Sequence, residues 1–370
     1  MGKLYFIIFG LCLTFISCRP SEGKEKKEVV VEQPGEVVST MIVNVENLRL
    51  RAKPGEEGEV LTTLEKGTIL TDLGEASNFY TEVTLRGIPY KEPWIKVQTP
   101  DSTIGWTFAG GLNFDLSHPS EIALQLVRKR LEYLFGESLT KKIEQYRFQY
   151  NSAKTSREFA AAFRTGKHLR DSLNKALEIR FDVTSYEIPP DLDWLSEPVP
   201  GYSTLLVAEG TQYYLFQNYK AMLPKVKATE GAEDNEFLEL NFQVYEQDSI
   251  ENFYPVWFMQ TWDYGGHSLL GRGLHLRTLE EIEEILDNTD LFEQEIIQIK
   301  SKILEDILNP ENTYWETQEK ILSEMDEILQ SGFSIFTEDE TVALIARKKM
   351  FAEPAENGIR LDVKSEAGNY

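Results

Sequence analysis

Short alternating segments fill one part of the chain, and longer segments with helical spacing follow. Between residues 41 and 114 the apolar segments are short and rich in β-branched residues, with turn residues such as Pro54-Gly55 and Lys66-Gly67 between them. This pattern predicts a small all-β barrel or sandwich rather than alternating strands and helices. Strands are expected at 42–45, 48–51, 60–64, 68–70, 80–85, 94–97 and 103–106.

From Asp115 onward, apolar residues recur every three to four positions. Ala123, Val127 and Leu131 belong to one such stripe, which ends at Gly136,. We therefore expect a mainly α-helical domain over residues 115–370, with a possible subdivision at the proline-rich stretch 182–201. Further helices are expected at 139–150, 156–177, 204–222, 235–245, 254–263, 279–287, 291–308, 313–329 and 338–351, and the alternation within 235–245 leaves a strand open there.

The first 17 residues have the pattern of a secretory signal peptide. Lys3 precedes an uninterrupted apolar or small run from Leu4 to Ser17,. This run is shorter than the roughly 20 apolar residues of a membrane-spanning helix, so we expect it to be cleaved. Cys12 and Cys18 are the two cysteines of the chain, which argues against a disulfide framework or a cysteine metal site in the folded body,.

Residues Phe15-Ile16-Ser17-Cys18 resemble a bacterial lipobox. The resemblance implies cleavage before Cys18 and acylation of that cysteine, with palmitate-type chains anchoring the protein in a lipid bilayer of the cell envelope. Phe15 departs from the family, where leucine is more usual, and an ordinary secretory signal is the alternative. Arg19 lacks the acidic character of inner-membrane retention signals in that family, which favours the outer membrane over the inner membrane. Residues 18–40 are charged and contain proline and glycine, as expected of a flexible tether,.

Within residues 41–114, several landmarks occur in the order found in bacterial SH3-like (SH3b) domains. They are Asn47-Leu48-Arg49-Leu50-Arg51, Pro54-Gly55, Lys66-Gly67, Trp94-x-Lys96-Val97 and Gly105-Trp106. This resemblance implies a small barrel that binds peptidoglycan peptides or envelope proteins without catalysis. The stretch from Asn78 to Pro93 departs from the family and predicts a loop or an extra hairpin that reshapes the usual groove.

Aromatic residues of this module are candidates for ligand contact. Trp94, Trp106, Tyr80, Tyr90 and Phe108 could provide flat surfaces for an extended peptide,. A domain of this size also needs its large side chains for its core, so a packing role is the alternative for each of them.

The stretch 257–275 is a second candidate site. It combines aromatic residues, glycines and the polar residues Asp263, His267 and Arg272, which could converge on a small ligand,. The alternative is a buried helical stripe beginning at Tyr254, with the glycines ending the helix.

Composition and missing motifs narrow the chemistry. The net charge of −23 and the lack of a basic patch argue against nucleic acid,. No His-Glu-x-x-His motif occurs, no cysteine nucleophile is left after acylation, and no phosphate-binding glycine loop is present, so we expect neither metal nor cofactor,. The 61 acidic residues leave a pair of catalytic carboxylates open,.

Together these features predict a multidomain, non-enzymatic lipoprotein of the cell envelope. Its SH3-like module would bind cell-wall peptide or a protein partner, and its helical domain would mediate interactions. Two alternatives remain: an envelope hydrolase that uses carboxylates of the helical domain, and a small-ligand sensor with a pocket near 257–275.

Overall fold

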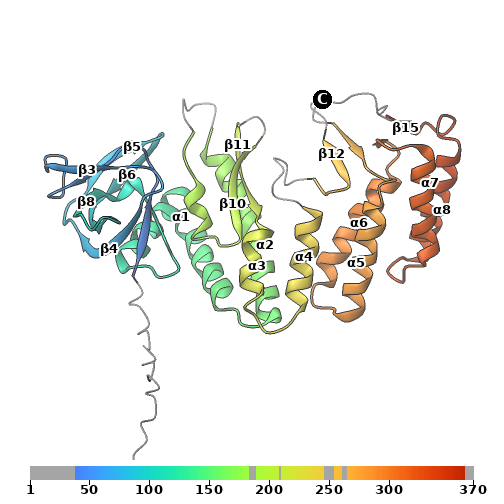
Figure 1. Cartoon of the computed structure of the whole chain (residues 1–370), viewed down its shortest axis with the longest axis horizontal. Coiled ribbons are helices and arrows are strands. Elements are labelled where there is room, and N and C mark those ends of the chain that lie inside the picture. The colour runs from blue at the N-terminus through green and yellow to red at the C-terminus, as the bar shows by residue number, and fades with distance from the viewer. Residues whose placement is uncertain (1–37, 183–188, 208–209, 246–253, 261–264, 363–370) are drawn as a thin grey trace, which may run out of the picture. The chain divides into compact units, whose positions relative to one another are not determined.

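Strands account for most of residues 40–114 (Figure 1). The computed structural model describes residues 38–182, 189–207, 210–245, 254–260 and 265–362. The expected signal peptide, Cys18 and most of the expected tether lie outside these residues. The strands are β1 (Thr40–Val43), β2 (Leu48–Arg51), β3 (Val60–Leu64), β4 (Ile69–Ala76), β5 (Thr81–Leu85), β6 (Ile88–Glu92), β7 (Trp94–Gln98), β8 (Ile104–Phe108) and β9 (Leu112–Phe114), with the 3-10 helix η1 (Ala109–Gly111) before β9.

Seven of these strands form one sheet in the order β3-β2-β8-β7-β4-β1-β9, and β5 pairs with β6 in a separate hairpin. Apolar residues on alternate positions, including Met41, Leu50 and Leu70, are fully buried and form the core of this all-β region,. The all-β prediction is confirmed.

The extra hairpin expected between Asn78 and Pro93 is present as β5–β6. Its strands are joined by Arg86 and Gly87, which both have positive φ (46° and 78°), as the central pair of a type I′ turn requires,. Leu85 therefore pairs directly with Ile88. Strands β6 and β9 were not among the segments expected from the alternation.

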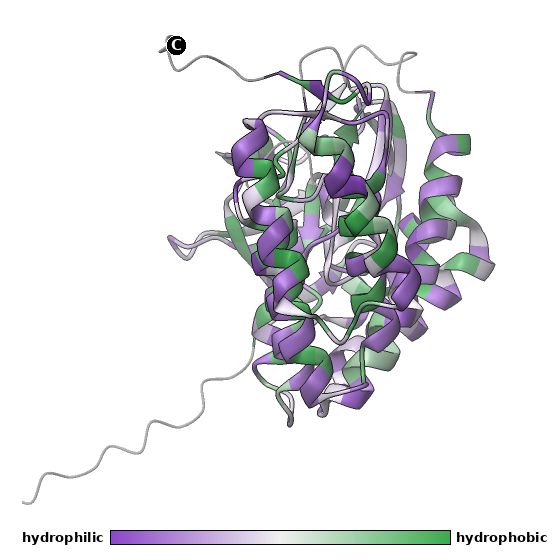
Figure 2. Cartoon of the chain, turned by 90° about the vertical axis from the view of Figure 1, so that its right-hand side faces the viewer, coloured by the Kyte–Doolittle hydropathy of each residue, from purple (hydrophilic) through white to green (hydrophobic). Residues whose placement is uncertain are grey.

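Helices dominate the rest of the described chain, which confirms the mainly α-helical prediction. Successive helices pack on each other, α1 on α2, α3 on α4 and α7 on α8. They carry hydrophobic and hydrophilic residues side by side, as Figure 2 shows, and bury the hydrophobic ones,. Their bounds are α1 (Glu121–Ser152), α2 (Ser156–Arg180), α3 (Tyr219–Val226), α4 (Glu233–Val244), α5 (Leu274–Asn288), α6 (Glu293–Leu308), α7 (Gln318–Ser331) and α8 (Glu338–Ala352), with the 3-10 helix η3 (Asp193–Ser196) between α2 and α3.

Helix α1 is kinked at Gly136, where the sequence pattern predicted a break. Gly136 has φ 74° and ψ 166°, a conformation outside the helical region. Only glycine adopts it without strain, so the residue type sets the position of the kink.

The helix expected at 204–222 is wrong over most of its length. The chain instead forms the hairpin β10 (Tyr202–Val207) and β11 (Gln212–Gln217), and α3 begins only at Tyr219. Aromatic and β-branched residues fill both strands, and Gly210, at φ 80°, lies between them. Cross-strand pairing of such residues outweighs their approximate helical spacing.

The helix expected at 254–263 is also wrong where the structure describes it. Residues Phe258–Gln260 form β12, which pairs with β13 (Gly266–Ser268), and residues 261–264 lie outside the described ranges. Strand β13 continues the sheet to β14 (Thr313–Tyr314) and β15 (Arg360–Leu361). Long-range strand pairing of this kind is invisible to a local spacing rule. For the same reason the helix expected from 313 starts later, at Gln318.

The helix expected at 235–245 is confirmed as α4, which resolves the strand alternative in favour of a helix. None of the helices in the described ranges combines the length and apolar character needed to cross a bilayer.

Candidate binding site

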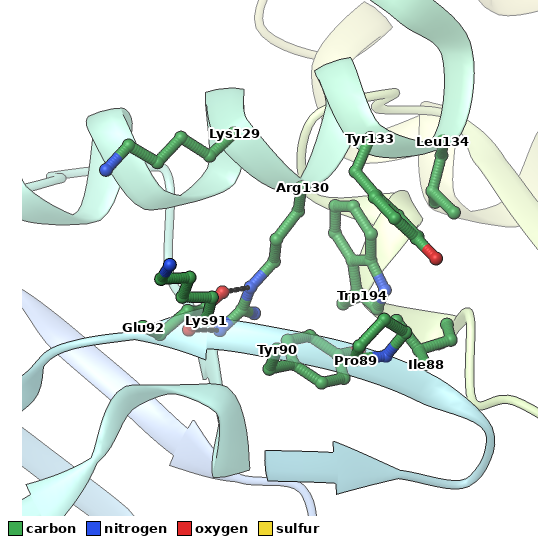
Figure 3. Close-up of a pocket in the computed structure, with 10 residues that line it drawn as sticks. All are labelled: Ile88, Pro89, Tyr90, Lys91, Glu92, Lys129, Arg130, Tyr133, Leu134 and Trp194. Carbon is green, nitrogen blue, oxygen red and sulfur yellow. Dashed lines mark hydrogen bonds and ion pairs between the residues drawn. The ribbon is translucent and has the colours of Figure 1, made fainter. Parts of the chain in front are cut away.

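A cavity of about 180 Å³ lies between the hairpin strand β6 and helix α1. Figure 3 shows side chains from both elements, together with Trp194 of η3, around this space. Its lining comprises Ile88, Pro89, Tyr90, Lys91, Glu92, Lys129, Arg130, Tyr133, Leu134 and Trp194. Residues from the all-β region and from the helical region therefore build it jointly.

A buried ion pair holds the two sides of the cavity together. Arg130 Nε donates to Glu92 Oε1 at 2.8 Å, and its Nη2 donates to Glu92 Oε2 at 2.7 Å. Two further guanidinium donors bind the carbonyl oxygens of Leu112 (2.8 Å) and Ala109 (2.9 Å). Burial alone would lower the pKa of Arg130, but the charge of Glu92 and its hydrogen bonds outweigh that effect and raise it,.

Aromatic rings surround this guanidinium. Its carbon lies 5.0 Å from the ring centre of Phe114, 5.3 Å from Tyr90 and 6.0 Å from Trp194. Burial raises the pKa of Tyr90 despite the opposing charge of Arg130, so its hydroxyl stays neutral. Because the charge of Arg130 is matched by Glu92 and enclosed by rings, this residue acts as scaffold and leaves little charge for a ligand.

The accessible part of the cavity is apolar with a positive rim. Tyr133 is 44% exposed, and Arg180 lies 4.2 Å from its ring centre, which holds the ring in place,. The exposed lysines Lys91 and Lys129 carry the positive charge of this rim, because Glu92 is already paired with Arg130. The buried Trp194 forms a wall, and its Nε1 has no hydrogen-bond partner among the described residues. Such a site suits a small apolar group attached to an anion.

Of the five aromatic residues singled out from sequence, Tyr90 lines this cavity and Tyr80 lies beside it. Tyr80 is 51% exposed, and its hydroxyl accepts a hydrogen bond from Lys129 Nζ at 3.1 Å. Trp94 is buried, packs edge-on against Phe108, and donates from Nε1 to Thr81 Oγ1 at 2.8 Å. Trp106 is half-buried on β8, opposite residues of β2 and β7.

The two described polar residues of the second candidate site contact different acidic residues. Asp263 lies outside the described residues. His267 Nε2 is 3.2 Å from Asp362 Oδ2, and Arg272 Nε donates to Glu316 Oε1 at 2.8 Å. Each of the two described side chains thus has its own acidic partner.

Sequence reasoning missed Lys129, Tyr133 and Trp194. Lys129 and Tyr133 are four residues apart and hence share one face of α1, but this face lies outside the buried stripe that marked the helix. Trp194 lies in the proline-rich stretch between helices. A large aromatic residue is unusual in such a stretch, and this feature was the one that could have identified Trp194 from the sequence.

A buried cluster between α5 and α6 resembles hydrolase chemistry only in composition. Asp306 Oδ2 accepts from Ser268 Oγ at 2.5 Å and lies 2.8 Å from His275 Nε2. In a serine hydrolase the histidine contacts the serine, whereas here both side chains bind the same carboxylate oxygen. His275 is fully buried, so the cluster stabilises the core,. Over the described ranges no group of three or more histidine, cysteine or acidic residues is placed to hold a metal ion.

Comparison with known proteins identifies the all-β region. Residues 46–113 match the family of bacterial SH3 domains. The chain therefore contains a bacterial SH3 domain, followed by a helical region that the match does not cover. No curated protein and no solved structure matches the chain.

Proposed function

We propose that the protein is a lipid-anchored, non-enzymatic component of the cell envelope that binds peptide chains of the cell wall. The SH3 domain is compatible with peptidoglycan or with protein ligands. Its hairpin β5–β6 and helix α1 supply the binding site together. The helical region thus completes the ligand site as well as mediating further interactions.

The cavity beneath Tyr133 is the observation that carries this proposal. It has apolar walls from Ile88, Leu134 and Trp194, and a rim on which Lys91 and Lys129 have no balancing acid in the lining. Cell-wall peptides combine alanine methyl groups with free carboxylates. A methyl group would fill the apolar space while a carboxylate meets the lysines, which favours such peptides over a purely apolar ligand.

The anchor is a separate part of the proposal. It rests on the lipobox-like residues ending at Cys18 and on the charged stretch to residue 40. Acylation would keep the SH3 domain within tether length of the wall, and the outer membrane is the favoured location. The mass of the native protein extracted from membranes would test it. A species that starts at Cys18 and carries acyl chains is expected, whereas an unmodified cysteine or an uncleaved leader would refute the anchor.

Peptide binding is tested by sedimenting the full chain with cell-wall sacculi. One sample contains intact sacculi, and the other contains sacculi from which an amidase has removed the peptides. We expect binding to the intact sacculi only. Equal binding to both preparations, or binding to neither, would refute a peptide ligand.

Two variants link that binding to the cavity. Tyr133→Ala opens one wall, and Lys129→Met removes one rim charge while keeping the length of the side chain. Each should weaken binding by about tenfold, the effect of losing about 1.4 kcal/mol. Lys142→Met is the matched control, because Lys142 is exposed on the same helix and does not line the cavity. Unchanged binding by both cavity variants would exclude this site.

A further inference from the structure

A second cavity, of about 240 Å³, lies within the helical region between α2, β11, α4 and α6. Its lining includes three cationic residues, Lys167, Arg170 and Lys302, and one acidic residue, Glu295. This excess of positive charge stands out in a chain whose net charge is −23. None of its residues belongs to the SH3 domain or to the cavity beneath Tyr133.

The one carboxylate in the lining, that of Glu295, is already paired with an arginine that does not line the cavity. Arg164, which does not line the cavity, donates from Nε to Glu295 Oε1 at 2.7 Å and from Nη2 to Oε2 at 3.0 Å. Partial burial would raise the pKa of Glu295, but the hydrogen bonds and charge of Arg164 outweigh it and lower the pKa. Glu295 thus stays ionised and paired with Arg164, and the charge of Lys167 also lowers its pKa, although Lys167 forms no ion pair with it.

Two of the cations have polar partners but no acidic one. Lys167 Nζ donates to Gln298 Oε1 at 2.9 Å, and Lys302 Nζ donates to the Tyr245 hydroxyl at 2.6 Å. Within the described ranges no carboxylate forms an ion pair with either ammonium group. Arg170 differs, because it shares its charge with Asp171 at 2.7 Å. The two lysines therefore provide positive charge without an ion-pair partner, which would attract an anion between α2 and α6.

The rest of the lining offers flat rings and amides. Tyr219 and Tyr245 stack at 6.0 Å with an angle of 24° between their planes, and Lys302 Nζ lies 5.0 Å from the ring centre of Tyr245. Asn241 is 4% exposed, donates from Nδ2 to the Phe237 carbonyl at 2.8 Å, and lines the cavity together with Gln217 and Gln298. Amide groups in the wall of a cavity match the hydroxyl or amide groups of a ligand.

We propose that this cavity binds a single-ring sugar that carries a carboxylate. The aromatic rings match the apolar face of a sugar ring, Asn241 and Gln298 match its hydroxyl and amide groups, and Lys167 and Lys302 match the carboxylate. Ligand sites usually enclose about 300–1,000 Å³, and this cavity of about 240 Å³ is smaller than that range, so it suits one ring rather than a chain,. The site is independent of the peptide site proposed above.

Calorimetric titration of the full chain with two sugars tests this inference. N-acetylmuramic acid is N-acetylglucosamine with an added lactyl carboxylate, so the pair isolates the charge. We expect saturable binding of the acidic sugar and at least about tenfold weaker binding of the neutral one. Binding of neither, or equal binding of both, would overturn the proposal. Benzoate that binds as tightly as the acidic sugar would overturn the sugar assignment.

Variants then assign the binding to this cavity. Lys302→Met should weaken binding of N-acetylmuramic acid by about tenfold, and Lys302→Arg should retain it, since the charge is kept. Lys175→Met, exposed on α2 and outside the lining, is the control. Thermal unfolding without sugar checks that each variant folds. If a folded Lys302→Met variant binds as the parent does, the site is wrong. Tyr133→Ala should leave this binding unchanged, which separates the result from the peptide proposal.

Discussion

Arg130 and Glu92 join the SH3 domain to the first helix of the helical region through a two-point ion pair. Their side chains are only 4% and 6% exposed. Glu92 ends the hairpin strand β6, and Arg130 lies near the middle of the first half of α1. The pair therefore fixes the hairpin against α1 and sets the width of the cavity between them.

Breaking this pair from one side should be costly. Glu92→Gln leaves the buried guanidinium without a counter-charge, so we expect a loss of about 3–5 kcal/mol in the free energy of unfolding. The double variant Glu92→Leu/Arg130→Met removes both charges and should recover part of that loss. Urea unfolding of the three proteins measures both effects. A single variant as stable as the parent would show that the pair does not hold these elements together.

The kink in α1 should depend on glycine. At φ 74° and ψ 166°, Gly136 occupies a conformation that a residue with a Cβ adopts only with strain, although the space around it is open. Gly136→Ala should thus cost about 1–3 kcal/mol. Ser138→Ala, exposed two residues later, should change stability by less than about 0.5 kcal/mol. Equal midpoints for both variants in urea unfolding would refute the strain argument.

Asp306 should stabilise the fold, because several buried side chains share its carboxylate as their hydrogen-bond partner. Asp306→Ala leaves Ser268, His275 and Asn312 without this carboxylate, to which they lie at 2.5, 2.8 and 3.1 Å. We expect a loss of about 3–5 kcal/mol, because several buried polar groups lose their partner at once. Ser268→Ala removes two hydrogen bonds, the one to Asp306 and the one that Ser268 Oγ accepts from the Leu270 N–H at 3.2 Å, and should cost about 2 kcal/mol,. Denaturant unfolding would contradict this view if the two losses were similar.

Acid should weaken the contact between α6 and α8. Lys300 Nζ donates to both carboxylate oxygens of Glu340 at 2.8 Å. Partial burial would raise the pKa of Glu340, but the hydrogen bonds from Lys300 and Thr337 outweigh it, so the pKa lies below the usual 4.5. A lowered pKa means that the folded state binds fewer protons than the unfolded state. The contribution is therefore present above pH 4.5 and is lost as the pH falls through the folded-state value.

The variant Glu340→Gln tests this pH dependence. It should be less stable than the parent at pH 7, and the difference should shrink as the pH falls below 4.5,. Glu338→Gln, exposed in the first turn of the same helix, is the matched control and should show little difference at any pH,. Urea midpoints between pH 7 and pH 3 measure the effect. A constant difference across this range would contradict the assignment.

Local patterns were sufficient for much of the fold. The turn pairs and alternation around Leu48 and Leu50 identified the SH3 domain, and the glycine at position 136 marked the break in α1. The same kind of reasoning failed at 204–222 and 258–260. In both segments the backbone pairs with another strand. A spacing rule that reads only a few neighbouring residues does not include that partner strand.

The candidate sites show the same difference between what local patterns reveal and what depends on residues far apart in the chain. Tyr80 was singled out because extended peptides bind in grooves lined by aromatic residues, and it does lie beside the cavity, where it accepts a hydrogen bond from Lys129,. Neither Tyr133 nor Lys129 carries a recognisable motif, because their role comes from facing β6, about 40 residues earlier in the chain.

The sequence by itself determined the class of each region, since strand alternation, helical spacing and glycine positions are local properties of neighbouring residues. It also limited the chemistry to be expected, because motifs such as His-Glu-x-x-His can be searched for directly. Only the tertiary structure decided which charged side chains have an oppositely charged partner and which do not. Arg130 is balanced by Glu92, whereas Lys167 and Lys302 face a cavity without an acidic partner among the described residues. Such pairing depends on distances between residues far apart in the chain, which folding alone sets.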